Sequence, residues 1–308
     1  MRRFLVMASG IAIATSAAAG CSLFVDLGDL TGGDDAGLVD ATDDFSTCSG
    51  SACDAASGAD VGASDGSVVV EAGPCDNAGT AGPRMVLADG FCIDSTEVTN
   101  QNYADFLAAG FSGSEPPTCT WKTNFLPDTS GSVDSDCTPG NVDVSTHPNF
   151  PISCVDWCDA WTYCKWAGKN ICANVNGSSL AYSDSVTTSS EWYLACATPA
   201  KNTYSTGTTY DGGCNLSSSS TVSVGSDTKC VGGYPGLLDM AGNVEEWADS
   251  CDSAGTDDDG GAWNDNCHEM GDCFNYSNVG AAHCNNADSD RRGSHWADVG
   301  FRCCAPLP

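Results

Sequence analysis

The cysteines are the residues of this sequence that could do the most chemistry, as metal ligands, as nucleophiles or in disulfides. The chain of 308 residues contains 20 of them. Metal-binding cysteines usually occur in Cys-x-x-Cys pairs or together with histidines. This chain has no such pair and only four histidines, namely His147, His268, His283 and His295. In an exported chain, cysteines at this density therefore predict a disulfide framework.

Cys273 is a weak candidate for a catalytic nucleophile. A reactive thiol needs a base or a basic neighbour, and His268 or His283 could serve. Asp272 and Glu269 lie next to it in the sequence and oppose formation of a thiolate. We therefore expect an inert or bridged cysteine, and the chain carries neither a His-Glu-x-x-His motif nor a phosphate-binding loop.

The N-terminal sequence predicts export. An arginine pair and an apolar stretch over residues 4–14 precede small residues at 18–20 and then Cys21. This order is typical of a signal peptide over residues 1–20. It resembles a bacterial lipobox, in which Cys21 is lipidated and anchors the mature protein to a membrane of the cell envelope; an ordinary secretory signal is the alternative. The apolar stretch is too short to span a bilayer.

The chain is strongly acidic, with 11 basic against 41 acidic residues. Removing the two arginines of the signal leaves 9 basic residues and a net charge of −32. Such a charge repels nucleic acid and anionic lipid headgroups, so we expect neither as a partner. Solubility alone is a sufficient reason for it.

Composition divides the mature chain in two. Residues 21–72 are rich in Gly, Ala, Ser and Asp and poor in aromatic residues, which predicts a disordered, extended tether. From residue 73 to 308 the aromatic content rises, and we expect a single folded domain.

Three helices are expected in this domain, among long polar loops. Thr99 is placed to cap a helix over residues 100–109, and Asp156 to cap one over 157–167. Residues 188–191 read as a capping box that opens a third helix through Cys196. Short strands such as 91–93 complete an irregular, loop-rich α+β domain that needs disulfides to hold it.

Five segments then resemble, in order, the formylglycine-generating enzyme or sulfatase-modifying factor domain family. They read FCIDSTEVTNQNYADF over 91–106, PISCVDWCDAWTYCKWAGK over 151–169, SEWYLAC over 190–196, GLLDMAGNVEEW over 236–247 and GFRC over 300–303. The resemblance implies a C-type-lectin-like α+β fold with few helices and short strands. It also implies a disulfide between Cys196 and Cys303, and we expect a second one between Cys214 and Cys230 because they close a short loop.

The resemblance further implies two metal sites. Enzymes of this family oxidise a substrate cysteine with copper held by two cysteines five residues apart. The matching segment here is EMGDCFNYSNVG over 269–280, where the two positions fall near Asn275 and Gly280. Neither is a cysteine, so we expect no bound copper. Cys273 lies where the family has a serine, and we expect it to stay outside the disulfides.

The second implied metal is calcium. It would be bound by the side chains of Asp239 and Glu246 and by the backbone carbonyls of Gly242 and Val244. Hard oxygen ligands of this kind suit calcium.

The sequence therefore predicts a lipid-anchored envelope protein whose domain acts as a non-catalytic binding or scaffold module. An envelope protein or a glycan would be its partner. The alternative is a copper-dependent or other metal-dependent oxidoreductase of the same family, acting on a cysteine of an exported protein.

Overall fold

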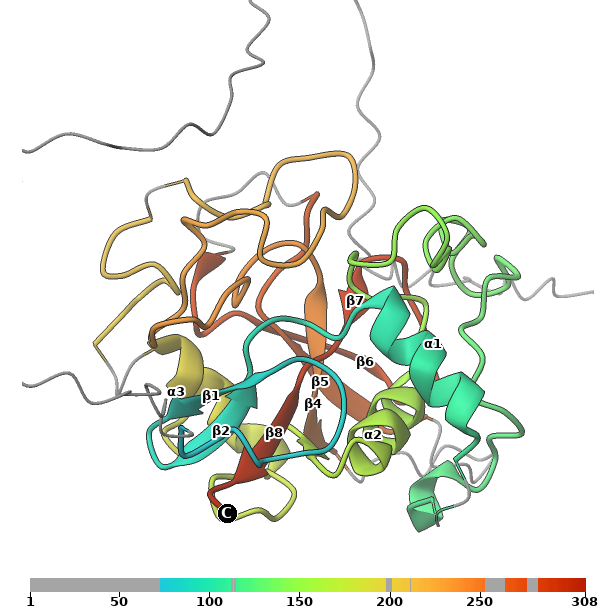
Figure 1. Cartoon of the computed structure of the whole chain (residues 1–308), viewed down its shortest axis with the longest axis horizontal. Helices are drawn as coiled ribbons and strands as arrows, with labels where there is room; N and C mark the ends of the chain where they lie inside the picture. The colour runs from blue at the N-terminus through green and yellow to red at the C-terminus, as the bar shows by residue number, and fades with distance from the viewer. Residues whose placement is uncertain are drawn as a thin grey trace, which may run out of the picture. The chain divides into compact units, whose positions relative to one another are not determined.

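Two small sheets form the frame of the domain in the computed structural model (Figure 1). The structure describes residues 73–308 except 112, 114, 198–200, 211, 253–263 and 276–281, so the expected signal peptide and tether lie outside the described residues. The first sheet has the order β1-β2-β8-β3 and is antiparallel throughout. Its strands are β1 (Met85–Ala88), β2 (Phe91–Asp94), β8 (Cys303–Pro306) and β3 (Asn170–Ile171).

The second sheet carries two adjacent glutamates discussed below, Glu245 and Glu246. Its order is β6-β5-β4-β7, and only the pair β4 and β7 is parallel. The strands are β6 (Ala287–Arg291), β5 (Asn266–Met270), β4 (Glu245–Cys251) and β7 (Val299–Gly300).

The helices begin where side chains can cap them. Helix α1 (Asn100–Ala109) has the predicted bounds, and the Thr99 hydroxyl accepts a hydrogen bond from the Asn102 amide at 3.2 Å. Helix α2 (Trp157–Trp166) begins after Asp156 as expected and ends one residue earlier than predicted. Two 3-10 turns, η1 (Pro117–Cys119) and η2 (Tyr182–Asp184), complete the helical elements of the described residues.

Helix α3 (Glu191–Ala197) corrects one detail of the prediction. It begins at Glu191, so this residue cannot be the third residue of a capping box. The Ser190 hydroxyl caps the helix by accepting from the Tyr193 amide at 3.3 Å. The Glu191 carboxylate instead accepts from the Ala173 amide at 2.8 Å and so ties the helix to the preceding loop.

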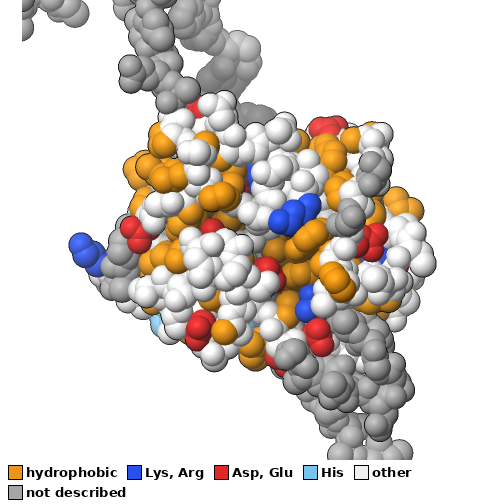
Figure 2. All heavy atoms as spheres, turned by 90° about the horizontal axis from the view of Figure 1, so that it is seen from below, with side chains coloured by type: hydrophobic (Ala, Val, Ile, Leu, Met, Phe, Trp, Pro, Cys, Tyr) orange, Lys and Arg blue, Asp and Glu red, His pale blue; other side chains and the backbone are white. Residues whose placement is uncertain are grey.

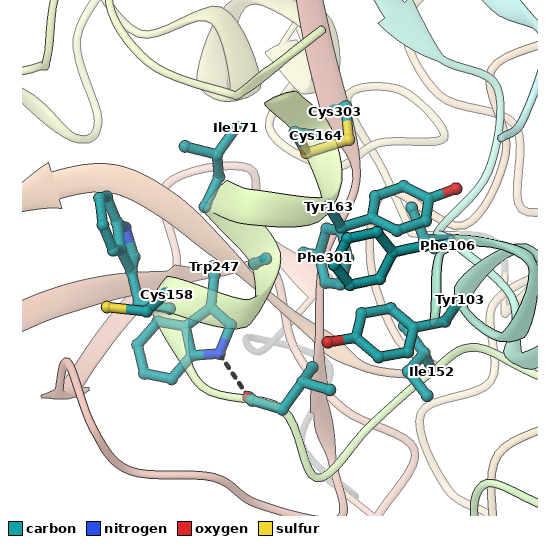
Figure 3. Packing of buried hydrophobic residues seen from close by; sticks show 14 of the residues in the cluster. Tyr103, Phe106, Ile152, Cys158, Tyr163, Cys164, Ile171, Trp247, Phe301 and Cys303 are labelled. Carbon is teal, nitrogen blue, oxygen red and sulfur yellow. Dashed lines mark hydrogen bonds between the residues drawn. A yellow bond between two sulfur atoms is a disulfide. The ribbon is translucent and has the colours of Figure 1, made fainter. Parts of the chain in front are cut away.

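An aromatic cluster joins the two longer helices, which pack against each other. Tyr103 and Phe106 of α1 meet Tyr163 of α2 and Phe301 (Figure 3). Ring centroids lie 5.2 Å apart for Tyr103 and Phe106 and 5.3 Å apart for Tyr163 and Phe301, both edge to face. Such pairs add about 0.5–1.5 kcal/mol each beyond the burial of their area. The remaining helix, α3, packs with β2 in a second cluster that includes Trp192 and Phe91.

Eight disulfides cross-link the described residues, in agreement with the framework predicted from composition. They join Cys75–Cys92, Cys119–Cys158, Cys137–Cys154, Cys164–Cys303, Cys172–Cys304, Cys196–Cys284, Cys214–Cys230 and Cys251–Cys267. Disulfides persist in oxidising, exported compartments, which is where such a chain belongs. None of the described helices is long and apolar enough to cross a membrane.

The expected bridge between Cys196 and Cys303 is wrong, and strand geometry gives the reason. Successive side chains of a strand point to opposite faces of the sheet. Cys303 of β8 therefore faces the aromatic cluster and joins Cys164 of α2. Its neighbour Cys304 faces the other cluster, where Cys196 also lies. Cys196 joins Cys284 there, while the expected Cys214–Cys230 bridge is present.

Candidate functional site

A buried ion pair connects the two most specific family segments. Arg302 is fully buried, and its Nε lies 2.8 Å from both carboxylate oxygens of Glu246. The Trp192 indole also donates to Glu246, at 2.7 Å. The guanidinium further donates to the backbone carbonyls of Asp94, Leu238 and Asp239 at 2.9–3.0 Å. Each charge is thus compensated locally, as a buried ion pair requires.

Two more carboxyl groups lie close to this ion pair. Glu97 is fully buried; its Oε1 accepts from the Asn243 side chain at 3.0 Å, and its Oε2 has no hydrogen-bond partner among the described residues. Burial and the charge of Asp239 raise the pKa of Glu97 well above its usual value. Burial likewise raises the pKa of Asp239 to about 6. Three carboxyl groups thus surround one guanidinium, a combination that favours an added cation.

The residues expected to bind calcium occupy this region in different ways. Asp239 has one carboxylate oxygen at the Gly225 amide (2.5 Å), which leaves the other for a ligand. Glu246 is fully engaged by Arg302 and Trp192. Gly242, with φ of +79°, packs so closely on the backbone of Asn215 that a side chain would meet its carbonyl at 2.6 Å. Val244 is buried. The assignment of these four residues to calcium therefore stays a prediction, and Asp239 fits it better than Glu246 does.

A second polar group lies at the end of β5. The ligand atoms of Glu245, Asp272 and Cys273 all lie within 4.8 Å of one another, and all three residues are buried. Asp272 accepts from the Asn286 side chain at 2.9 Å, and burial raises its pKa to about 7. The Cys273 thiol donates to the Asn275 side chain at 3.3 Å.

This group includes one residue that the sequence analysis singled out and one that it missed. Cys273 lies in no disulfide, as expected, and is the sole described cysteine of that kind. Glu245 was not considered, although it directly precedes Glu246 on β4. Side chains alternate along a strand, so two adjacent glutamates serve opposite faces and hence different sites.

The positions expected to carry copper ligands hold no thiol pair. Asn275 is exposed and bonds to Cys273, while Gly280 lies outside the described residues. Cys284, the nearest further cysteine in the sequence, is bonded to Cys196. The two candidate bases are also occupied. His268 lies 2.9 Å from the Tyr182 carbonyl, and His283 packs edge to face on Tyr204.

Comparison with known proteins decides the family. The model of the sulfatase-modifying factor enzyme 1-like domain matches residues 54–306, which is most of the chain. The chain belongs to this family. A search of the curated proteins finds no match.

Solved structures show similar folds at low identity. CarF is 18% identical over 75% of this chain and 96% of its own, with a TM-score of 0.44. PvdO from Pseudomonas aeruginosa is 18% identical; the match covers 70% of this chain and 80% of PvdO, with a TM-score of 0.42. Variable protein 1 of Treponema denticola is 17% identical; the match covers 74% of this chain and 93% of the variable protein, with a TM-score of 0.41.

Proposed function

We propose that this protein is a lipid-anchored binding or scaffold module of the cell envelope and does not generate formylglycine. The state of its cysteines carries the proposal. Copper(I) is selected by soft sulfur ligands, and the family's chemistry needs two thiolates on one ion. In the described part of the matching segment, Cys273 is the sole thiol, and Cys284 is held in a disulfide. Carboxylates rather than a second sulfur surround Cys273.

The test is an oxidation assay on a model substrate. Purified, copper-loaded protein is incubated under oxygen with a peptide containing Cys-x-Pro-x-Arg, and the peptide mass is followed. We expect the peptide to remain a thiol or to form disulfides only. Conversion of its cysteine to an aldehyde, lost in Cys273→Ala, would contradict the proposal.

The runner-up is a metal-dependent oxidoreductase that uses a different ligand set. The group of Glu245, Asp272 and Cys273 favours it, because one sulfur and two carboxylates together suit a borderline divalent ion better than copper(I). Repeating the assay with zinc-, manganese- and iron-loaded protein separates this alternative from a binding module. Turnover with any of these ions that Asp272→Asn abolishes would favour the enzyme.

We also propose that calcium stabilises the surroundings of Arg302. The open oxygen of Asp239 and the Oε2 of Glu97, which has no hydrogen-bond partner among the described residues, are hard oxygen ligands of the kind that calcium prefers. A ligand that binds only the folded state raises its stability with concentration. We expect a chelator to lower the melting temperature of the wild type and to have little effect on Asp239→Asn. An equal effect on both proteins would remove Asp239 from the site.

A further inference from the structure

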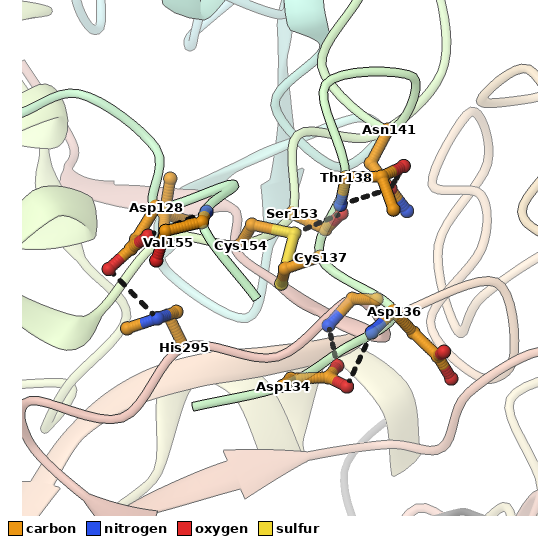
Figure 4. The surroundings of a disulfide bond; sticks show 12 residues. Asp128, Asp134, Asp136, Cys137, Thr138, Asn141, Ser153, Cys154, Val155 and His295 are labelled. Carbon is orange, nitrogen blue, oxygen red and sulfur yellow. Dashed lines mark hydrogen bonds and ion pairs between the residues drawn. A yellow bond between two sulfur atoms is a disulfide. The ribbon is translucent and has the colours of Figure 1, made fainter. Parts of the chain in front are cut away.

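A pocket at the start of α2 is not used by any of these roles. Its volume is about 420 Å³, which falls in the range of small-ligand sites. The segment 121–128 forms one wall, the start of α2 the floor, and residues near His295 the other wall. The contact between Asp128 and His295 joins the two walls, and the disulfide Cys137–Cys154 lies next to them (Figure 4).

The floor of the pocket carries two carboxyl groups and one ammonium group. Lys122 Nζ lies 2.6 Å from Asp156 Oδ2 and 2.7 Å from Asp159 Oδ1. The other oxygen of each carboxylate accepts the backbone amide of the other aspartate, at 3.0 and 3.1 Å. Lys122 thus lies between the two carboxyl groups, in the place that a cationic ligand would take.

The walls combine apolar and polar groups. Trp121 is half-buried and lines the pocket; its indole nitrogen donates to the Thr118 carbonyl, and the Lys122 ammonium lies 5.7 Å from the centroid of its ring. Leu126 is 62% exposed beside it. Across the pocket, His295 is only 8% exposed, and its Nε2 makes no aligned hydrogen bond within the described residues, although Asp128 Oδ2 lies 3.3 Å away. A buried polar nitrogen of this kind calls for a partner.

These observations select the charge of the ligand. An anion would approach three carboxyl groups, those of Asp128, Asp156 and Asp159, and be repelled. The Lys122 ammonium already occupies the position between Asp156 and Asp159 that a cation would take. A neutral ligand avoids both costs, and hydroxyl groups can donate to Asp128 and accept from Lys122 or His295. The apolar wall of Trp121 and Leu126 requires that one face of the ligand be apolar.

We propose that this pocket binds a neutral sugar unit of a glycan, with the ring on Trp121 and the hydroxyls toward Lys122, Asp128 and His295. A sugar ring has an apolar C–H face and a rim of hydroxyls, which matches the two kinds of wall. The proposal rests on the proposed function as a binding module and names its ligand class. Acidic side chains are scattered among hydrophobic and uncharged ones on the face in Figure 2, so charge alone does not mark a binding surface there.

The experiment measures binding of the purified full chain to an array of neutral, acidic and amino-bearing oligosaccharides, followed by titration. We expect neutral oligosaccharides to bind, and Trp121→Ala to weaken binding about tenfold. Leu126→Ser gives a second test that cannot be ascribed to misfolding, because this side chain is mostly exposed. The matched control is Trp161→Ala, a half-buried tryptophan of α2 outside the pocket, which should bind as the wild type does.

Three results would overturn the proposal. These are binding to no neutral oligosaccharide, binding that neither Trp121→Ala nor Leu126→Ser weakens, and preferential binding of lysine-rich peptides. None of these results involves oxidation of the cysteine peptide. The oligosaccharide experiment therefore tests the glycan site, and the peptide oxidation assay tests the proposed function separately.

Discussion

At the scale of single residues, Arg302 and Glu246 show how a family signature serves the core. Two segments that are far apart in the sequence meet through one guanidinium, which also binds three backbone carbonyls. Both side chains are fully buried, so water cannot replace either of them as the partner of the other. A buried ion pair of this kind favours one packing of the loops over others, while its net contribution to the free energy of unfolding is small.

Removing one charge of this pair should therefore be costly. We expect Glu246→Gln to lower the free energy of unfolding by about 3–5 kcal/mol, because the buried charge of Arg302 loses the carboxylate that contacts it directly. Chemical denaturation of the disulfide-intact protein measures this. Asp136→Asn, at an exposed position, is the control and should change stability by less than about 0.5 kcal/mol. A similar small change in Glu246→Gln would contradict the role given to the pair.

At the scale of elements, helix α3 is fixed at both ends by groups that the sequence only partly revealed. Its first residue, Glu191, is buried and reaches the Ala173 amide, while Cys196 near its end is bonded to Cys284. Burial raises the pKa of Glu191 from 4.5 to about 7, and the nearby charge of Asp249 adds to this. The folded protein thus holds a proton on Glu191 that the unfolded chain releases near pH 4.5.

The sign of the pH dependence follows from this shift. The contribution of Glu191 to stability is fully present below about pH 4.5 and is lost as the pH rises through 7. We expect Glu191→Gln, which stays neutral, to match the wild type at pH 4 and to exceed its stability at pH 8, by at most about 3 kcal/mol. Urea unfolding at both pH values measures the difference. Leu126→Ser, which changes no titratable group, should show no such divergence.

At the scale of the whole molecule, the eight disulfides among the described residues replace the long helices and broad sheets that usually hold a domain of this length. The elements are short, and most are linked to another element or loop by a bridge. This framework also agrees with folding outside the reducing cytosol.

Anchoring is the property of the whole molecule that the N-terminal sequence predicts. We expect the wild type to fractionate with membranes and its mature N-terminus to be a lipidated Cys21, while Cys21→Ser should be released or mislocalised. Fractionation and mass spectrometry of the N-terminal peptide measure both. A wild-type protein recovered without lipid, in the aqueous fraction, would exclude the anchor.

The sequence by itself determined the family, the class of fold, the bounds of α1 and the start of α2, because these depend on local patterns such as caps and aromatic spacing. It also identified Cys273 as the cysteine outside the bridges and the Cys214–Cys230 pair, whose partners are 16 residues apart. Tertiary structure decided the long-range pairing. The face of β8 on which Cys303 lies, and hence its bond to Cys164 rather than Cys196, depends on strand register. Two further groupings, Glu97 with Arg302 and Glu245 with Cys273, also arise where strands distant in sequence become neighbours. The spacing of residues along the chain cannot predict such contacts.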